Sequence, residues 1–291
     1  MSPMGNILVV GSINMDLVTQ AKEFPRPGQT LVGSQFATYA GGKGANQAVA
    51  AARLGARVTL IGRVGNDAFG HELKARLARE GIDIQWVREV AETSTGIASI
   101  TVCNSENAIL IVPGANALLS PEDLDAAATA FAAADVVLAQ LEVPLATVEH
   151  AALLAQRAGK PFMLNPAPAI RLPTSLIERC TVLTPNEHEI ATALGSSDLS
   201  SLPSGRVVMT KGEEGAYYRD TTGQVRHEPA LPVTPVDTTG AGDAFCGAFA
   251  AFWHLGLEEA VRRGCAAAAL SVTKPGAQEG MPTLKELESG W

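Results

Sequence analysis

Residues 237–247 read DTTGAGDAFCG, a glycine-rich turn that runs into a carboxylate and then into an apolar stretch. That stretch, residues 244–257, predicts a helix, and the first backbone N–H groups of a helix are unpaired and carry a partial positive charge. An anion could approach closely here and meet the amides of Gly240, Ala241 and Gly242. Asp243 follows them, placed to accept a proton from a group that meets the anion, so the turn indicates phosphoryl transfer to a hydroxyl. From this segment alone, a simple N-cap role for Asp243 is an equal alternative.

A second set of polar residues follows the first predicted strand, residues 7–10. Asn14 and Asp16 stand in the loop after it, and loops at the carboxyl ends of parallel strands are where α/β sheets bind ligands. They offer several acceptors and a donor, which suits sugar hydroxyls, although an Asn- and Asp-rich turn is an equal alternative. Residues 41–46 read GGKGAN and enter a helix, where glycines permit close approach and Lys43 supplies a cation. Their spacing is not that of a P-loop.

Three further strand ends carry polar residues. Glu142 ends one strand, and Asn186 and Glu189 follow another, three residues apart and therefore on one face of the first helical turn. Glu189 either complements the helix dipole or, beside a phosphate, holds Mg²⁺ through waters. Residues 210–212 read TKG and offer a hydroxyl and backbone amides to a nucleotide.

Short β-branched runs alternate with alanine-rich helical patterns along most of the chain. The predicted buried strands are residues 7–10, 58–61, 136–139, 162–164, 181–183 and 207–209. The predicted helices are residues 43–54, 68–79, 121–133, 145–158 and 187–194. This alternation predicts an α/β fold, with a mostly parallel sheet covered by helices on both faces.

Two segments, residues 16–39 and 95–112, alternate apolar and polar side chains instead. Residues 104–107 read NSEN and stand between two such runs as a hairpin turn would. We expect these segments to pair as a small sheet outside the main one and to cover, as a lid, a site at the strand ends. Apolar residues on both faces of residues 97–102 predict pairing with a second copy, and hence a homodimer through the lid.

Composition limits the classes of function. With 291 residues, 46% of them apolar and 18% charged, the chain fits one large globular domain. A net charge of −8 without a Lys/Arg cluster argues against a nucleic-acid partner. We expect no membrane span, since the apolar stretch 244–257 is short and contains His254. We expect no secretory signal, since the first residues show no charged region followed by an apolar one. Four scattered cysteines without a Cys-x-x-Cys pair indicate buried thiols in a reducing cytoplasm rather than a metal site.

Taken together, the motifs resemble the ribokinases of the PfkB carbohydrate-kinase family. In the family's order and rough spacing, they are Asn14/Asp16 and residues 41–46, 185–189 and 237–243. The resemblance covers nearly the whole chain and implies one Rossmann-like ribokinase domain, residues 1–291, with a lid formed by about residues 14–40 and 93–113. It further implies transfer of the γ-phosphoryl group of ATP to the 5-hydroxyl of D-ribose, giving ribose 5-phosphate and ADP.

The resemblance also implies a role for each matching position. Asp243 would be the base, and Gly240, Ala241 and Gly242 the anion hole. The sugar would be held by Asn14, Asp16, Gly42, Lys43, Asn46 and Glu142, together with Asp243. ATP would be contacted by Asn186, Thr210, Lys211, Gly212, Gly215, Gly242 and Cys265, and Mg²⁺ by Glu189. A monovalent cation, usually K⁺ in ribokinases, would be held by Asp237, Thr239, Ser271, Lys274, Gly276 and Gly280.

The chain departs from the family pattern at three places. Gly280 stands where ribokinases commonly carry a serine whose oxygen reaches the cation, so we expect water in place of that ligand. Cys265 stands near the expected adenine, where the family suggests His or Asn. Residues 195–205 are short, and we expect the family's usual helix to be missing there.

Other functions fit less well. A dinucleotide-binding dehydrogenase needs GxGxxG after the first strand, where this chain reads GSINMD. A non-catalytic sugar sensor would have no use for Asp243. Among kinases, a nucleoside acceptor calls for an aromatic-lined pocket, whereas the lid strands carry few aromatic residues, such as Phe36 and Tyr39. A hexose-phosphate acceptor calls for extra cations. A small free pentose, ribose first, fits best, with deoxyribose, a ketohexose or a nucleoside left open.

Overall fold

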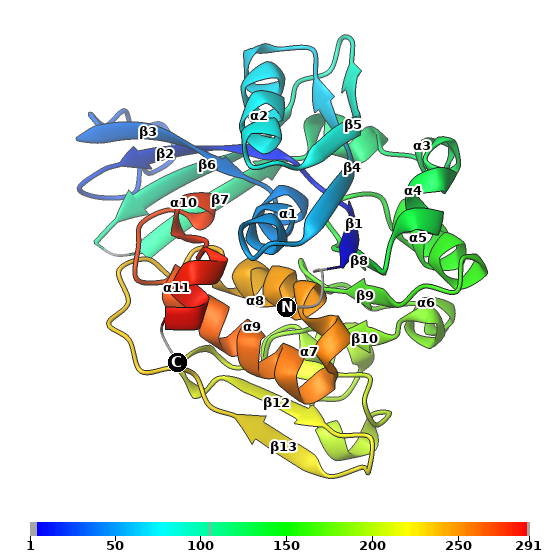
Figure 1. Ribbon diagram of the computed structural model, residues 1–291. Helices are drawn as coiled ribbons and strands as arrows, with labels where there is room; N and C mark the ends of the chain where they lie inside the picture. The colour runs from blue at the N-terminus through cyan, green and yellow to red at the C-terminus, as the bar shows by residue number, and fades with distance from the viewer. Residues whose placement is uncertain (1–4, 105, 290–291) are drawn as a thin grey trace.

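The main sheet of the computed structural model, which describes residues 5–104 and 106–289, has six parallel strands in the order β10-β9-β8-β1-β4-β5 (Figure 1). They are β1 (Asn6–Val10), β4 (Arg57–Gly65), β5 (Asp83–Val90), β8 (Val136–Ala139), β9 (Phe162–Leu164) and β10 (Val182–Leu183). Five of them match predicted strands. The edge strand β5 was not predicted, and the predicted strand at 207–209 lies in another sheet.

Alternate residues of β1 show how the sheet is covered. Ile7 and Val9 point into one hydrophobic cluster, and Leu8 and Val10 into another on the opposite face. The first cluster is covered by α1 (Lys43–Arg53), α2 (Ala68–Arg79), α8 (Ala241–Ala251) and α9 (Leu257–Ser271). The second is covered by α3 (Pro121–Ala126), α4 (Ala128–Ala133), α5 (Leu145–Arg157) and α6 (Thr174–Arg179). The predicted fold class, a mostly parallel sheet between helical layers with a small separate sheet, is confirmed.

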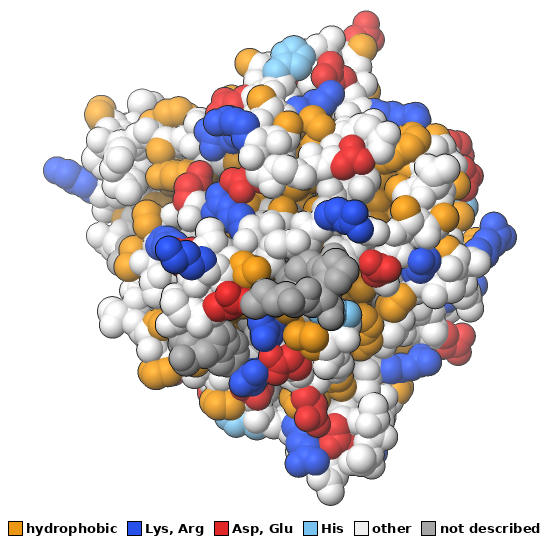
Figure 2. All heavy atoms as spheres, viewed as in Figure 1, with side chains coloured by type: hydrophobic (Ala, Val, Ile, Leu, Met, Phe, Trp, Pro, Cys, Tyr) orange, Lys and Arg blue, Asp and Glu red, His pale blue; other side chains and the backbone are white. Residues whose placement is uncertain are grey.

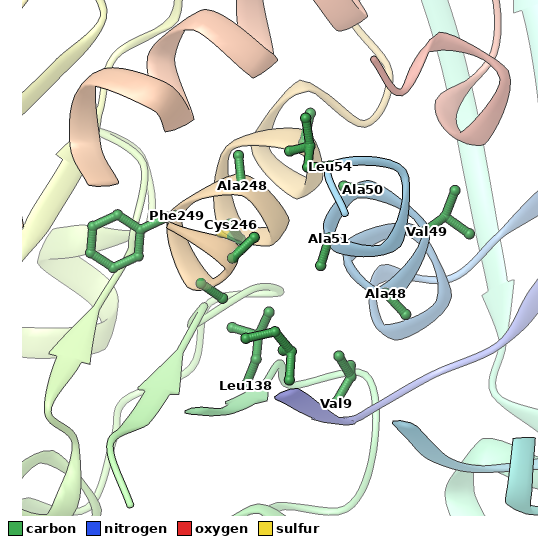
Figure 3. Packing of buried hydrophobic residues seen from close by; sticks show 14 of the residues in the cluster. Val9, Ala48, Val49, Ala50, Ala51, Leu54, Leu138, Cys246, Ala248 and Phe249 are labelled. Atoms are coloured by element: carbon green, nitrogen blue, oxygen red, sulfur yellow. The ribbon is translucent and has the colours of Figure 1, made fainter. Parts of the chain in front are cut away.

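Helices α1 and α8 pack side by side above β1 and β8, with Ala50 and Ala51 on the side of α1 that faces α8 (Figure 3). A glycine sets their separation: a Cβ on Gly247 would lie 2.6 Å from the Cβ of Ala50 and 2.6 Å from the carbonyl oxygen of Gln47. Small residues let two helix backbones approach closely. The N-terminal turns of the two helices, which carry the GGKGAN and GAGD motifs, are thereby held beside each other.

Several predicted helix boundaries were wrong. The apolar stretch 244–257 is not one helix: α8 ends at Ala251, a 3₁₀ turn follows, and α9 begins after Gly256, whose φ of 94° breaks the helical path. The predicted helix 121–133 is divided at Ala127 into α3 and α4. The predicted helix 187–194 is reduced to α7 (Ile190–Leu194), because residues 187–189 form a turn.

A three-stranded antiparallel sheet extends the β10 edge. It consists of β11 (Val208–Thr210), β12 (Ala216–Arg219) and β13 (Val225–Glu228). Two isolated parallel bridges, Leu183 to Val207 and Asn186 to Thr210, connect it to the main sheet. Between α7 and β11 the described chain has only a short 3₁₀ turn, Leu199–Ser201, so the expected absence of a full helix at 195–205 is confirmed.

The segments with alternating polarity form a separate four-stranded sheet in the order β3-β2-β6-β7, which projects beside α10 (Ala277–Gly280) in Figure 1. Its strands are β2 (Asn14–Gln20), β3 (Gln35–Gly41), β6 (Gly96–Cys103) and β7 (Glu106–Val112). The strands β6 and β7 pair antiparallel with Cys103 opposite Glu106, so residues 106–107 belong to a strand rather than to the predicted turn. Ser105 of that turn lies outside the described residues.

The exposed apolar residues of the four-stranded sheet lie mainly on β7, not on both faces of β6 as expected. Leu110 is 75% exposed, and Ile109, Ile111 and Val112 are about half exposed. On the face shown in Figure 2, basic and acidic side chains are interspersed. Within the described part of the chain, no helix combines the length and apolar character needed to cross a bilayer.

A short C-terminal helix, α11 (Leu284–Ser289), packs against α9.

Candidate active site

The glycine-rich turn forms the start of α8. Gly240 is the residue before the helix and has a φ of 80°, a backbone conformation that favours glycine. A Cβ on Gly242 would meet no atom within 4 Å, so this turn presents bare backbone to a cavity that it lines. In this structure the Ala241 N–H donates to the carbonyl of Thr238 at 3.3 Å. An anion that uses all three predicted amides must therefore displace that hydrogen bond.

Asp243 is not a helix cap. It is the third residue of α8, and its carboxylate, 6% exposed at the residue level, accepts hydrogen bonds from the neighbouring helix α1. Asn46 Nδ2 donates to Oδ2 and Gln47 Nε2 to Oδ1, each at 2.9 Å. The N-cap alternative is wrong, because the side chain is turned away from the N–H groups of its own helix and held at the cavity wall.

Glu142 and Lys43 meet at the start of α1. Glu142 Oε2 accepts from the Lys43 N–H at 3.0 Å and from Ser12 Oγ at 2.6 Å, which places a carboxylate at the positive end of the helix. Burial alone would lower the pKa of the Lys43 ammonium group. The carboxylates of Asp243, Glu142 and Glu189 outweigh burial and raise that pKa above its usual value. Lys43 is therefore a fixed positive charge among three carboxylates.

Asn14 and Asp16 lie in strand β2 beside these groups, and not in the loop or turn that was expected after the first strand. Asn14 is buried, and its Oδ1 accepts from Asn116 Nδ2 at 2.7 Å. Burial, strengthened by the carboxylates of Glu142 and Asp243, raises the pKa of Asp16 to about 7. The Asp16 carboxylate lies against Gly41. A Cβ at position 41 would lie 2.5 Å from both carboxylate oxygens, so this arrangement requires glycine there.

A cavity of about 1090 Å³ extends from Lys43 and Asp243 between the three-stranded sheet and α9. Its lining combines a polar end with an apolar slot. The predicted nucleotide residues that line it are Asn186, Thr210, Gly212, Gly215, Gly242 and Cys265. Glu189, the residue predicted for Mg²⁺, also lines it. The slot adds Leu231, Pro232, Val233, Ala268 and Val272. Burial raises the pKa of the Cys265 thiol to about 12, so this residue enters the slot as a neutral side chain.

Of the predicted nucleotide residues, Asn186 is bonded to Glu189 at the cavity wall, whereas Lys211 lies outside the cavity lining. Asn186 and Glu189 bond reciprocally: Asn186 Oδ1 accepts from the Glu189 N–H, and Glu189 Oε2 accepts from the Asn186 N–H, both at 2.9 Å. Burial raises the pKa of Glu189, against the lowering effect of that N–H. Lys211 does not line the cavity and instead pairs with Glu214 at 2.8 Å.

The six predicted cation residues lie on two segments, residues 237–239 and residues 271–280, the second of which runs from the end of α9 to the end of α10. Asp237 joins them, since its carboxylate accepts from the N–H groups of Thr239 and Gly276, each at 2.9 Å. Burial opposes ionisation, but these hydrogen bonds lower the pKa of Asp237. A Cβ on Gly280 would lie 2.6 Å from the Ser271 carbonyl oxygen and 3.6 Å from that of Lys274. The Lys274 ammonium is paired with Glu286.

Membership of a family follows from comparison with known proteins. Residues 4–284 match the model described as pfkB family carbohydrate kinase. The chain belongs to this family. It is therefore a carbohydrate kinase, which sets aside both the dehydrogenase and the sugar-sensor hypotheses. It is 41% identical to the ribokinase of Bacillus subtilis (strain 168) over 290 residues, covering 98% of this chain and 99% of that one.

Two further relatives bear on the acceptor. The deoxyribokinase of Salmonella typhi is 39% identical over 297 residues, with 97% of each chain covered. The structure of Arabidopsis thaliana ribokinase complexed with ribose and ATP superimposes on this kinase with a TM-score of 0.90, at 30% identity, covering 99% of this chain and 98% of that one.

The sequence did not predict the glutamine side chains that hydrogen-bond to the predicted site residues. Gln47, Gln140 and Gln278 are buried polar residues in contact with Asp243 or Asn46, or with each other. Gln47 directly follows the GGKGAN motif and Gln140 precedes Glu142 by two residues, so proximity to a motif was the available signal. Gln278 carried none, because it reaches the site from the far end of the chain.

Proposed function

We propose that this kinase transfers the γ-phosphoryl group of ATP to the 5-hydroxyl of D-ribose, with Asp243 as the base. The observation that carries the proposal is the position of the Asp243 carboxylate. It lies at the wall of the 1090 Å³ cavity, beside the glycine turn and the Lys43 side chain. A transferred phosphoryl group at the turn would therefore meet an acceptor hydroxyl at the carboxylate.

The polar groups beside Asp243 support a small sugar as the acceptor. Asn14, Asp16 and Glu142 surround the start of α1 with carbonyl and carboxylate oxygens, which suit several hydroxyl groups. Aromatic side chains that could stack on a base are sparse in the four-stranded sheet above them, which favours a free sugar over a nucleoside. The ribokinase relatives favour ribose, and the Salmonella typhi relative makes deoxyribose the second candidate.

The mechanism follows from the arrangement of charge. Phosphoryl transfer passes through a loose transition state, so positioning and electrostatic stabilisation supply most of the rate. The amides of residues 240–242 would stabilise the transferred group, once the Ala241 N–H leaves the Thr238 carbonyl. The Lys43 ammonium group would attract the phosphoryl group by its charge and donate a hydrogen bond to the sugar. Asp243 would accept the hydroxyl proton late, a role that needs no strong base.

Two cations belong to the proposal. The Glu189 carboxylate at the cavity wall suits Mg²⁺, which takes few protein ligands and neutralises phosphate charge. For K⁺, the Asp237 carboxylate and the Ser271 and Lys274 carbonyls that Gly280 faces supply the uncharged and charged oxygens that it needs.

The domain and assembly assignments are also proposals. We propose one domain over residues 1–291, in which residues 14–40 and 93–113 form a lid over the sugar site. The exposed apolar residues of β7, with Leu110 the most exposed among them, support a homodimer through this sheet. Four buried free cysteines support a reducing compartment such as the cytoplasm.

A panel of acceptors tests the proposed function. ADP release is measured with ATP and ribose, deoxyribose, fructose or adenosine, each with and without K⁺. We expect the highest kcat/KM with ribose, and a lower rate when tetramethylammonium replaces K⁺. A higher kcat/KM for any other acceptor would overturn the ribose assignment, and equal rates in the two salts would overturn the K⁺ assignment.

A further inference from the structure

A buried amide network lies beside Asp243; its members Gln47 and Gln140 do not line the cavity, whereas Asn165 does. Gln47 in α1 is 0% exposed. Its Nε2 donates to Asp243 Oδ1 at 2.9 Å and to Asn165 Oδ1 at 3.2 Å, and its Oε1 accepts from Gln140 Nε2 at 2.6 Å. Every polar atom of the Gln47 side chain is thus engaged, and three strand or helix ends converge on it.

The partners of Gln47 allow only one orientation of its amide. Reversing the amide would place Oε1 against two acceptor oxygens and Nε2 against the donor of Gln140. Asn165 cannot reverse either, because its Nδ2 donates to the carbonyl of Thr184 at 2.9 Å. The N–H that Asp243 receives is therefore fixed by residues one contact further away.

The position of Gln140 is energetically unfavourable at one end of its side-chain amide. Its Oε1 is buried and has no hydrogen-bond partner among the described residues. A Cβ on Gly11 would come within 2.1 Å of that oxygen, so only glycine at position 11 leaves room for it. An unpaired buried carbonyl destabilises a fold, and its presence here indicates that the other end of the amide has a role.

We propose that Gln47 is a positioning residue for phosphoryl transfer, and that Gln140 sets the direction of its amide. The inference rests on the proposed function, in which Asp243 is the base. Gln47 and Asn46 donate to different oxygens of that carboxylate, so together they fix its rotation about the Cβ–Cγ bond. The two donors are adjacent in α1, which α8 approaches closely at Gly247.

Several charged groups face Asp243 and enter any pH profile. Lys43 faces it from α1, Asp16 from β2 and Glu189 from the turn before α7, while the thiol of Cys246 belongs to α8 itself. The pKa of Asp16 is raised to about 7, so the variants are compared at pH 8, where that carboxylate is mostly ionised.

The test measures kcat and the KM for ribose at pH 8 in Gln47→Met, which keeps side-chain length but removes the donor. We expect kcat to fall about tenfold to a hundredfold, as misplacement of a reacting group does, with the KM changed less than about threefold.

Gln140→Met provides a second test if Gln47→Met does not fold, since it leaves every donor to Asp243 in place. We expect a smaller fall in kcat, again with little change in the KM. An unchanged kcat in a folded variant, or a KM for ribose that rises by as large a factor as kcat falls, would overturn the positioning role. Asp243→Asn is measured in parallel: wild-type turnover in that variant overturns the proposed base instead, so the two failures are distinguishable.

Discussion

Gln278 donates through Nε2 to Asn46 Oδ1 at 3.0 Å, and Asn46 in turn donates to Asp243. Gln278 belongs to α10, the short helix bounded by Gly276 and Gly280 of the proposed K⁺ site. Arg53 holds α10 from the other side, since its Nη1 donates to the Gln278 carbonyl at 2.7 Å and to that of Met281 at 3.0 Å. Two hydrogen bonds therefore join the cation loop to the proposed base.

Gln278→Leu should lower kcat by about tenfold and reduce the activation by K⁺. Asn46 Oδ1 loses the N–H donor that orients the Asn46 amide, so the hydrogen bond from Asn46 to Asp243 is no longer fixed. The measurement is the initial rate against K⁺ concentration. Gln156→Leu, an exposed change on α5, is the matched control and should leave both values unchanged. A wild-type K⁺ response in Gln278→Leu would remove the proposed link between loop and base.

Asp16 should make ribose binding depend on pH near neutrality. Its pKa is raised to about 7, so the carboxylate is protonated below pH 7 and accepts fewer hydrogen bonds from hydroxyls. We expect the KM for ribose to rise as the pH falls from 8 to 6, and Asp16→Asn to flatten that dependence. A wild-type KM that stays constant over this range would contradict the assignment of Asp16 to the sugar.

The raised pKa of Asp16 also predicts that folding stability falls as the pH rises, whereas ribose binding improves. Because its folded pKa lies above the unfolded value of 3.8, Asp16 makes the fold less stable as the pH rises from about 4 to about 7. Asp16→Asn should therefore raise the melting temperature more at pH 8 than at pH 5. The check is thermal unfolding at both values, and an equal shift at the two would show that burial does not oppose ionisation here.

Gly280→Ala should weaken K⁺ activation without removing catalysis. The added Cβ would lie 2.6 Å from the Ser271 carbonyl oxygen, so that proposed K⁺ ligand must move. We expect the K⁺ concentration for half-maximal rate to increase severalfold, while kcat at saturating K⁺ falls less. ATP binding measured in parallel controls for wider damage. An unchanged K⁺ requirement would place the cation elsewhere.

Leu110→Asp should shift the protein from dimer to monomer in sedimentation velocity. This side chain is 75% exposed on β7, and a charge there cannot be buried against a second copy. Val225→Asp, at an exposed apolar position on β13, is the matched control. The proposed interface fails if Leu110→Asp sediments as the wild type does.

The sequence was a good guide wherever one residue pattern had one structural outcome. Buried runs such as residues 7–10 are apolar on both faces because both faces are covered, and they were recognised as parallel strands. The edge strand β5 was missed because its DIQWVREV mixes exposed charges with one buried residue and three partly buried ones. The α8 boundary was missed because an apolar composition hides a break that only the conformation of Gly256 makes clear.

The site was predictable in the residues that stand at strand ends and less so in those behind them. Asp243 and Lys43 occupy motifs whose chemistry can be inferred from residue type and position. Gln47 and Gln140 acquire their roles only from partners about 90 to 200 positions away in the chain. Spacing along the sequence carries no information on such contacts, which depend on how closely α1 and α8 pack.

The most direct test of the central claim is the turnover of Asp243→Asn with ribose and ATP, measured as ADP release beside ribose binding by calorimetry. The account predicts that kcat falls by about a thousandfold or more, since the proton acceptor is lost, while ribose still binds within a few-fold of wild-type affinity. Turnover near the wild-type rate would contradict the assignment of Asp243 as the base.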